Sequence, residues 1–380
     1  MPHLSRFLLL AAALLPALHA TAPAAATAEA ARIARVENGL LPPARIAGTP
    51  PETWTIPARM AFYQVPGVSI ALINHGAIEW ARGYGMTNSK APSPVTPDTP
   101  FHAGVLREPV LDIAILTLAE AGQLTVHSYI GDLIKSPKFY ANMVGSAKFS
   151  ALLLNRVLHP LEMRATAFDP NPSIGLQTTP SDLARFALAL QQAYTGHPGP
   201  LSRASAEAML TRRDSPGDLG LELKGAGADF SFRRGDHSEN ACSFLVAFPR
   251  TGQGAVVMIN SGAGVMLAGE ILRAIACEYA WPDYQVVEKA TVALAPAAFD
   301  NFAGIYERDD TVLRIFREGG RFYLKPRSQP RLEIFPRSDH EFFLLDEADT
   351  FSFERNAEGI VTHFIRRHPG GGPQVFRRAD

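Results

Sequence analysis

Residues 101–122, FHAGVLREPVLDIAILTLAEAG, join a short strand-like approach to a small turn and a long apolar run. The turn lies at Ala103-Gly104, and the apolar run predicts a helix over residues 107–121 that Gly122 can end. Such a frame can present a reactive side chain at the tip of the turn. The tip instead carries Val105, whose side chain offers no nucleophile and no hydrogen-bonding group.

Strand patterns lie on both sides of this stretch. Residues 65–85 predict two strands around the turn Asn74-His75-Gly76, which is a hairpin signal. Residues 243–260 predict a second pair of strands, joined by a turn that is rich in glycine. The chain therefore has strands near both ends of one domain.

Helix patterns fill the space between and after these strands. In residues 178–194, Thr179 can cap a helix and Pro180 suits its first turn. Residues 266–281 form a second amphipathic pattern. Together the elements predict an α+β fold, with an antiparallel sheet flanked by helices and closed by both ends of the domain.

The last part of the chain has a different pattern. From residue 296 to 380, short alternating runs are separated by Gly, Asp, Asn and Pro, which predicts a small all-β domain of barrel type. We therefore expect the main domain at residues 29–284, a linker from Pro282 to Pro296, and the small domain at 296–380.

The first residues predict export. Arg6 precedes the apolar run FLLLAAALLPALHA, and small residues follow as far as Ala28, which is typical of a cleaved secretory signal at residues 1–28. The apolar run is shorter than the about 20 residues that span a bilayer. We expect a periplasmic or secreted protein with no membrane segment after cleavage, and an uncleaved N-terminal anchor helix is the alternative.

Composition excludes several classes of partner. The chain has 36 basic and 37 acidic residues, a formal net charge of -1, and no long run of either sign. Nothing therefore steers it toward nucleic acid or anionic lipid. We expect small molecules or proteins as partners.

The two cysteines, Cys242 and Cys277, are too few for a cysteine-rich zinc site. One disulfide between them and two separately buried thiols are both compatible with the sequence. The sequence also lacks a His-Glu-x-x-His motif, carboxylates at metal-ligand spacing and a phosphate-binding Gly-Lys loop. We expect no metal and no cofactor.

Several phrases in the same order along the chain resemble the serine beta-lactamase-related superfamily, which contains class C beta-lactamases, DD-peptidases and related esterases. The small C-terminal domain also resembles one that is appended to many of these hydrolases. The phrases are VPGVSIALINHGAIEWARGYG, VTPDTPFHAG, LAEAGQLTV, RVLHPLEM, GLQTTPSDLARFALALQ and LVAFPRTGQGAVVMINS. The resemblance covers residues 60 to 380 and implies a beta-lactamase/transpeptidase-like fold.

The resemblance implies a Ser-x-x-Lys motif, in which an amine accepts the proton of a nucleophilic hydroxyl. The family's serine position falls on Val105 and its lysine position on Glu108, and no serine in the chain has a lysine three residues further on. Loss of a hydrolase nucleophile costs on the order of a millionfold in turnover.

The second family motif, Tyr-x-Asn, is matched by Tyr140 and Asn142, only 35 residues beyond Val105. These two residues are either relics of a site or a chance match, since the domain is shorter than its relatives near residues 136–148. A relic Tyr140 would line what is left of the cleft.

The third family motif, a Lys-Thr-Gly or His-x-Gly strand, is missing where the resemblance places it. That segment is filled by Arg233, Arg234, Gly235 and Asp236, and His237 follows late. The candidates for a relic cleft are Arg233, Arg234, Gly235 and His237. The charge change also predicts that Glu108 pairs with Arg234 or Arg233, although a carboxylate at a helix start is also favourable on its own.

The sequence therefore predicts a non-catalytic protein with the fold of a serine hydrolase, a pseudoenzyme that binds a peptidoglycan fragment or another envelope protein. The alternative is a serine hydrolase of esterase, beta-lactamase or D-Ala peptidase type with a displaced nucleophile. Ser69 in a strand and Ser261 in a turn are better explained by packing. A third interpretation is a decaying gene product with a compromised core.

Overall fold

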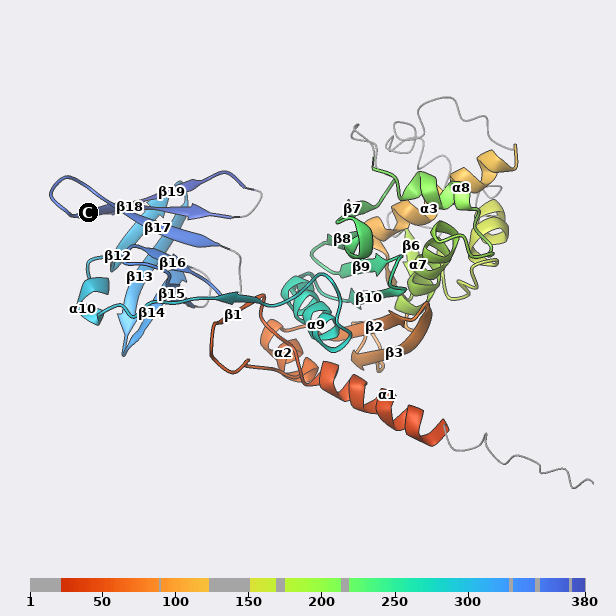
Figure 1. The fold of residues 1–380 in the computed structure, drawn as a ribbon, viewed down its shortest axis with the longest axis horizontal. Helices are drawn as coiled ribbons and strands as arrows, with labels where there is room; N and C mark the ends of the chain where they lie inside the picture. Colours follow the sequence, from red (N-terminus) through yellow and green to blue (C-terminus); the bar gives the residue numbers. More distant parts are fainter. Residues whose placement is uncertain are drawn as a thin grey trace, which may run out of the picture.

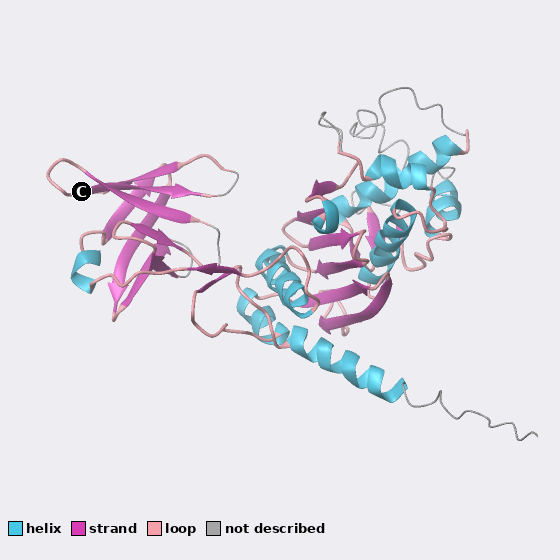
Figure 2. Cartoon of the chain, viewed as in Figure 1, coloured by secondary structure: helices cyan, strands magenta, loops and turns pink. Residues whose placement is uncertain are grey.

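The computed structural model describes residues 22–88, 90–122, 151–168, 175–212, 219–327, 331–345, 349–368 and 371–379. These residues form an α+β domain with a sheet between two layers of helices, followed by a β-barrel (Figure 1). Figure 2 shows the same division, with helices concentrated in the first domain and strands in the second. The predicted α+β fold with a small all-β C-terminal domain is confirmed.

The central sheet has six antiparallel strands in the order β3-β2-β10-β9-β8-β7. The strands are β2 (Gly67–Asn74), β3 (Ala77–Gly85), β7 (Glu222–Lys224), β8 (Ser231–His237), β9 (Cys242–Phe248) and β10 (Gln253–Ile259). Both predicted strand pairs are confirmed. At the β2–β3 turn, His75 and Gly76 have φ of 50° and 72°, the positive pair that a tight hairpin turn requires.

Helices cover both faces of this sheet. One apolar core packs the sheet against α1 (Ala22–Glu37), α2 (Ile56–Tyr63) and α9 (Val265–Glu278). The other core packs it against α3 (Arg107–Glu120), α7 (Pro180–Tyr194) and α8 (Arg203–Met209). Alternate residues of β2 and β10 enter opposite cores, because successive side chains of a strand point to opposite faces.

The predicted helices occur with the expected ends. The helix predicted at residues 107–121 is α3, and the one predicted at 178–194 is α7. The side chain of Thr179 accepts a hydrogen bond from the backbone N–H of Asp182 at 3.1 Å, as an N-cap does. Shorter helical turns are η1 (Gly104–Leu106), η2 (Leu154–Leu158), η3 (Gly227–Asp229) and η4 (Gly262–Gly264).

A small antiparallel sheet leads the chain into the turn at Val105. Its strands are β4 (Phe101–His102), β5 (Ala167–Phe168) and β6 (Leu176–Thr178), in the order β4-β6-β5. The backbone N–H of Ala103 donates to the carbonyl of Leu176 at 2.9 Å. The small sheet therefore fixes the residue that immediately precedes the turn.

The predicted linker contains a strand that the sequence did not indicate. β11 (Val287–Lys289) pairs in parallel with β1 (Ala44–Ile46), a segment about 240 residues earlier. The Nζ of Lys289 also donates to the carbonyl of Leu344 at 2.9 Å, and the N–H of Ala44 donates to that of Leu345. Figure 1 shows β1 at the junction with the barrel.

The C-terminal domain is a closed antiparallel barrel of eight strands. The strands are β12 (Gly304–Arg308), β13 (Thr311–Glu318), β14 (Arg321–Pro326), β15 (Leu332–Pro336), β16 (Glu341–Phe343), β17 (Thr350–Arg355), β18 (Val361–Arg367) and β19 (Gln374–Arg378). The short helix α10 (Pro296–Phe299) precedes it, and Phe299 stacks on Phe322 with ring centroids 4.0 Å apart. Buried aromatic rings, together with buried leucine, isoleucine and valine side chains, form the barrel core.

The predicted signal peptide at residues 1–28 stays a prediction, because residues 1–21 lie outside the described ones. α1 begins at Ala22 and is exposed at residues 26–28, whereas Ile33 and Val36 are buried. Among the described residues, no helix combines the length and the apolar character needed to cross a membrane.

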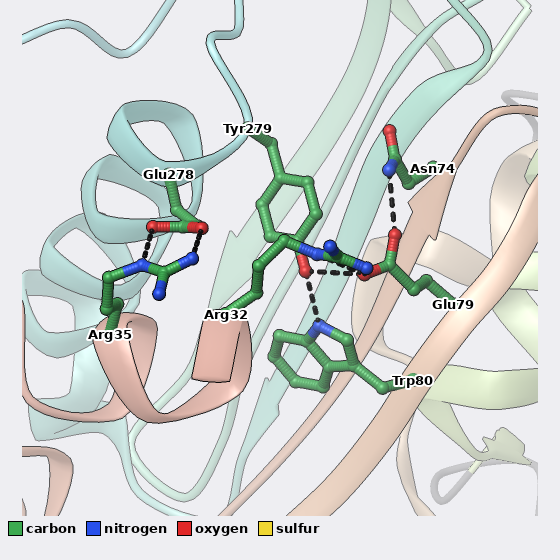
Figure 3. Close-up of polar contacts among 7 residues, drawn as sticks. All are labelled: Arg32, Arg35, Asn74, Glu79, Trp80, Glu278 and Tyr279. Carbon is green, nitrogen blue, oxygen red and sulfur yellow. Dashed lines mark hydrogen bonds and ion pairs between the residues drawn. The ribbon is translucent and has the colours of Figure 1, made fainter. Parts of the chain in front are cut away.

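A polar network fastens α1 to the sheet and to α9 (Figure 3). Glu79 accepts hydrogen bonds from Arg32 at 2.9 Å, Asn74 at 2.7 Å and Tyr279 at 2.9 Å, and Trp80 donates to the Tyr279 hydroxyl. Burial raises the pKa of Glu79, but these hydrogen bonds outweigh it and hold the pKa below its ordinary value. Burial likewise raises the pKa of Tyr279 to about 12, so its hydroxyl remains a donor.

We predict that Glu79→Gln lowers the free energy of unfolding by about 1–3 kcal/mol at neutral pH, because the network loses its charged acceptor. A lowered pKa means that this stabilisation is complete above the ordinary value of 4.5 and is lost as the pH falls through the folded-state pKa. Denaturant unfolding of wild type and variant at neutral and at acidic pH measures the difference.

The matched control is Glu52→Gln, which removes an exposed carboxylate. Its effect should stay within about 0.5 kcal/mol. If Glu79→Gln lowered the free energy of unfolding equally at neutral and at acidic pH, the role given to the ionised carboxylate would be contradicted.

Candidate functional site

A hydrogen bond from the central sheet anchors the turn at Val105. Its first residue, Ala103, is fully buried, and its carbonyl accepts a hydrogen bond from Ser243 Oγ of β9 at 3.0 Å. Gly104 follows with φ of 56°, a left-handed conformation that favours glycine. η1 and α3 then run directly on from the turn. Strand β9 and this glycine therefore set where Val105 and Glu108 lie.

Val105 makes its polar contact through the backbone. Its N–H donates to Asp236 Oδ2 of strand β8 at 3.2 Å. The same oxygen lies close to Gly104, since a Cβ added there would be 2.8 Å from Oδ2. The carboxylate of Asp236 therefore fits against the turn only because residue 104 has no side chain.

The predicted pairing of Glu108 with an arginine of the third-motif segment is confirmed. Arg234 Nη2 lies 2.5 Å from Glu108 Oε2, and each side chain is 31% exposed. The Nε of Arg234 is buried and, among the described residues, has no hydrogen-bond partner. Nη2 of Arg234 is therefore paired with Glu108, whereas its Nε has no hydrogen-bond partner among the described residues.

The other candidates for a relic cleft lie elsewhere on β8. Arg233 pairs with Glu222 of the neighbouring strand and lies 3.9 Å from Asp283, and its bond to Glu222 raises its pKa. Gly235 packs against a phenylalanine of β9, because an added Cβ would lie 2.5 Å from the ring of Phe244.

His237 is exposed at the end of β8, opposite Cys242. Successive side chains of β8 point to opposite faces of the sheet. The face that carries Arg234 meets the turn, whereas Arg233, Gly235 and His237 lie on the opposite face. Tyr140 and Asn142 lie outside the described residues.

Asp236 and Ser243 are the site residues that the sequence did not single out. Asp236 follows Arg234 by two positions, so the period-2 alternation of a strand already places both on one face. That signal becomes usable once residues 231–237 are known to form a strand beside the turn. Ser243 carries no comparable signal in the sequence.

The serines considered as displaced nucleophiles are engaged in the structure. Ser69 is fully buried and donates to the carbonyl of Thr96 at 3.2 Å, and Ser261 caps η4 by accepting from Ala263.

Ser338 and Asp339 lie beside His340 in the barrel, but both contact its Nδ1. A catalytic triad uses both ring nitrogens, so this cluster cannot relay a proton from serine to aspartate.

The cysteines are both free. Cys242 is buried and its Sγ lies 3.1 Å from the carbonyl of Ser261, and burial raises the pKa of its thiol. Cys277 is exposed on α9, which corrects the expectation of a disulfide or of two buried thiols. It faces away because it lies on the outer side of a helix whose inner side packs on the sheet. Among the described residues, no cluster of His, Cys, Asp and Glu could hold a metal ion.

Comparisons with known proteins indicate the family and the fold that this chain resembles. Residues 55–143 match the family model described as Beta-lactamase, a range that includes Val105 and Glu108. The resemblance to the serine beta-lactamase-related superfamily is thereby confirmed. In this beta-lactamase-like frame, the matched range runs from α2 through the β2–β3 hairpin and the turn to α3. No curated protein matches the sequence.

Two solved structures share the fold at a TM-score of 0.50 or more. The octameric penicillin-binding protein homologue from Pyrococcus abyssi is 14% identical, with a TM-score of 0.53 over 85% of this chain and 98% of that one. The crystal structure of SurE is 17% identical, with a TM-score of 0.50 over 85% and 97%. D-alanine carboxypeptidase AmpC from Burkholderia cenocepacia is 16% identical, with a TM-score of 0.45 over 57% and 96%. At these identities the likeness to the first two structures concerns the fold alone.

We predict a measurable coupling between Glu108 and Arg234. A double-mutant cycle of Glu108→Gln and Arg234→Gln should give a coupling energy of about 0.5–1 kcal/mol in denaturant unfolding, because the pair is only partly exposed. The exposed pair Arg203–Glu207 on α8 is the matched control, with an expected coupling of about 0.3–0.5 kcal/mol. A coupling of zero between Glu108 and Arg234 would show that the two charges do not hold β8 to the helix.

Proposed function

We propose that this chain is a non-catalytic binding protein on a beta-lactamase-like fold, a pseudoenzyme of the cell envelope. The observation that carries the proposal is the pair of contacts at the turn. The positions that hold nucleophile and lysine in the family are Val105 and Glu108, and both are tied to β8, by Asp236 and Arg234. Contacts that hold elements together occupy the place where acyl transfer would need reactive groups.

The chemistry supports this proposal. Acyl transfer by this family needs a hydroxyl for attack and a nearby base for its proton, and a valine side chain supplies neither. Glu108 is a carboxylate engaged by a guanidinium, so the local charge is opposite to that of a lysine. With the nucleophile missing, a loss on the order of a millionfold in turnover is expected.

The occupant that we propose is a peptidoglycan fragment or another envelope protein. The near-zero net charge gives no general attraction to nucleic acid or to a membrane surface. The placement in the periplasm or outside the cell follows from the predicted signal peptide at residues 1–28. Removal of these residues is compatible with the fold, because Ile33 and Val36, which anchor α1, follow the cleavage point.

The proposal predicts that the purified protein forms no acyl adduct. Incubation with a fluorescent penicillin and with a fluorophosphonate, followed by intact-mass spectrometry, should leave the mass unchanged. Nitrocefin and p-nitrophenyl esters should not be hydrolysed above the buffer rate. A class C beta-lactamase treated in parallel is the positive control.

A stable adduct would overturn the proposal. Turnover that a single Ser→Ala change abolishes would favour the serine hydrolase with a displaced nucleophile. Poor expression with no melting transition would instead favour a decaying gene product.

Export gives a separate prediction. Protein expressed with its full sequence in a Gram-negative host should be recovered from the periplasm with a mass that corresponds to loss of residues 1–28. Full-length protein in the membrane fraction would support the uncleaved anchor.

A further inference from the structure

We propose that a polar hollow at the C-terminal end of α7 is a second binding site, whose ligand is an amino acid or dipeptide with a free amine and a free carboxylate. The hollow has a volume of about 580 Å³, which is within the range of small-molecule sites. Its lining side chains are all polar or charged, and they are Tyr194, Thr195, Arg203, Glu207, Thr211 and Arg250. The inference goes beyond the proposed function, because it concerns another part of the domain.

The hollow lies away from the turn at Val105. It is formed by the end of α7, by α8 and by the turn between β9 and β10, and Figure 1 shows α7 and α8 on the same side of the sheet. Ser243, which contacts the turn at Val105, lies near the start of β9, whereas Arg250 follows its end. The stretch from Ser243 to Phe248 spans roughly 16 Å, because a strand rises about 3.3 Å per residue. The two sites are therefore at opposite ends of β9.

The walls of the hollow are held by contacts behind them. The ring of Tyr194 packs on that of Phe230, with centroids 5.6 Å apart. The side chain of Ser202 caps α8 by accepting from the N–H of Ser205 at 2.9 Å, and both serine hydroxyls donate to Glu120 of α3. A ligand therefore meets a preformed surface and loses little affinity to the ordering of the protein.

One part of the lining suits an anionic group. Arg250 is exposed and has no hydrogen bond or ion pair with any other described residue. Its guanidinium offers a planar fork of donors, which matches the two oxygens of a carboxylate. The hydroxyl of Tyr194 also has no partner within the described ranges, so it is a further donor.

Another part of the lining suits a protonated amine. Glu207 Oε1 accepts from Arg203 Nε at 2.7 Å, whereas Oε2 has no partner in the described part of the chain. The hydroxyls of Thr195 and Thr211 donate to the carbonyls of Gln191 at 2.8 Å and of Glu207 at 2.6 Å. Both hydroxyls therefore have only acceptor capacity left, and an ammonium group has three donors to offer.

The presence of both kinds of group in one hollow assigns the ligand class. A simple anion would use Arg250 and leave the acceptors without a partner, and a simple amine would do the reverse. An amino acid or a dipeptide carries both charges on one short chain, so it can use Arg250 and Glu207 together.

The test compares three matched probes. Glycylglycine has both charges, N-acetylglycylglycine lacks the amine, and glycylglycinamide lacks the carboxylate. Each is titrated at constant ionic strength and at about pH 6.5, where an α-amine is protonated. The purified protein carries ¹⁵N-threonine, and the amide signals of Thr195 and Thr211 are assigned from their loss in Thr195→Ser and Thr211→Ser.

The proposal predicts saturable movement of both signals with glycylglycine, at an affinity at least tenfold tighter than with either blocked probe. Arg250→Gln should weaken the binding of glycylglycine at least tenfold and leave that of glycylglycinamide unchanged. Glu207→Gln should weaken the binding of glycylglycine at least tenfold, but it should not weaken that of N-acetylglycylglycine.

The matched controls are Arg156→Gln and Glu52→Gln, which remove exposed charges outside the hollow and should change each affinity by less than twofold. Signals of Thr195 and Thr211 that do not move would overturn the proposed site. Equal affinity for glycylglycine and a blocked probe would overturn the ligand class. Effects of Arg250→Gln and Glu207→Gln no larger than those of the controls would show that the hollow does not hold the ligand.

Discussion

The central sheet is buried on both faces, and this constraint determines where the helices and the turn at Val105 must lie. Side chains of its inner strands alternate between two apolar cores, and each core needs its own layer of helices. Because α3 covers one of these cores, its first residues come to rest beside β8. The contacts of Arg234 and Asp236 with the turn follow from that placement.

The turn combines a rigid support with side chains that cannot react. Ser243 and Leu176 hold Ala103 from two different sheets, and Gly104 provides the backbone conformation that points the chain into α3. An active site needs support of this kind, because its groups must lie within about 0.5 Å of the productive geometry. Here the group that it positions is a valine.

Much of this fold could be predicted from the sequence, because its signals are local. The hairpin at residues 65–85, the helix after Arg107 and the cap at Thr179 each depend on neighbours a few residues away. The parallel pairing of β1 with β11 could not be predicted, since its partners are about 240 residues apart and each is three residues long.

The candidate site could likewise be predicted where it depends on sequence position and charge, but not where it depends on distances between segments far apart in the chain. The absence of Ser-x-x-Lys and the pairing of Glu108 with Arg234 came from sequence position and charge, and the structure contains that ion pair. The role of Asp236 depends on the distance between a strand and a turn that are 131 residues apart, which composition and spacing do not encode. The exposure of Cys277 likewise depends on which side of α9 packs.

The central claim is that the site has lost more than its nucleophile, because Asp236 and Arg234 of β8 contact the turn and α3 at the place of the family's third motif. The most direct measurement is the turnover of nitrocefin and p-nitrophenyl esters by the double variant Val105→Ser with Glu108→Lys. The account predicts hydrolysis no faster than that of the folded wild-type protein, since Asp236 still occupies the backbone donor at residue 105 and Arg234 faces the new lysine. Turnover restored in the double variant would show that the rest of the active site is intact and would contradict the account.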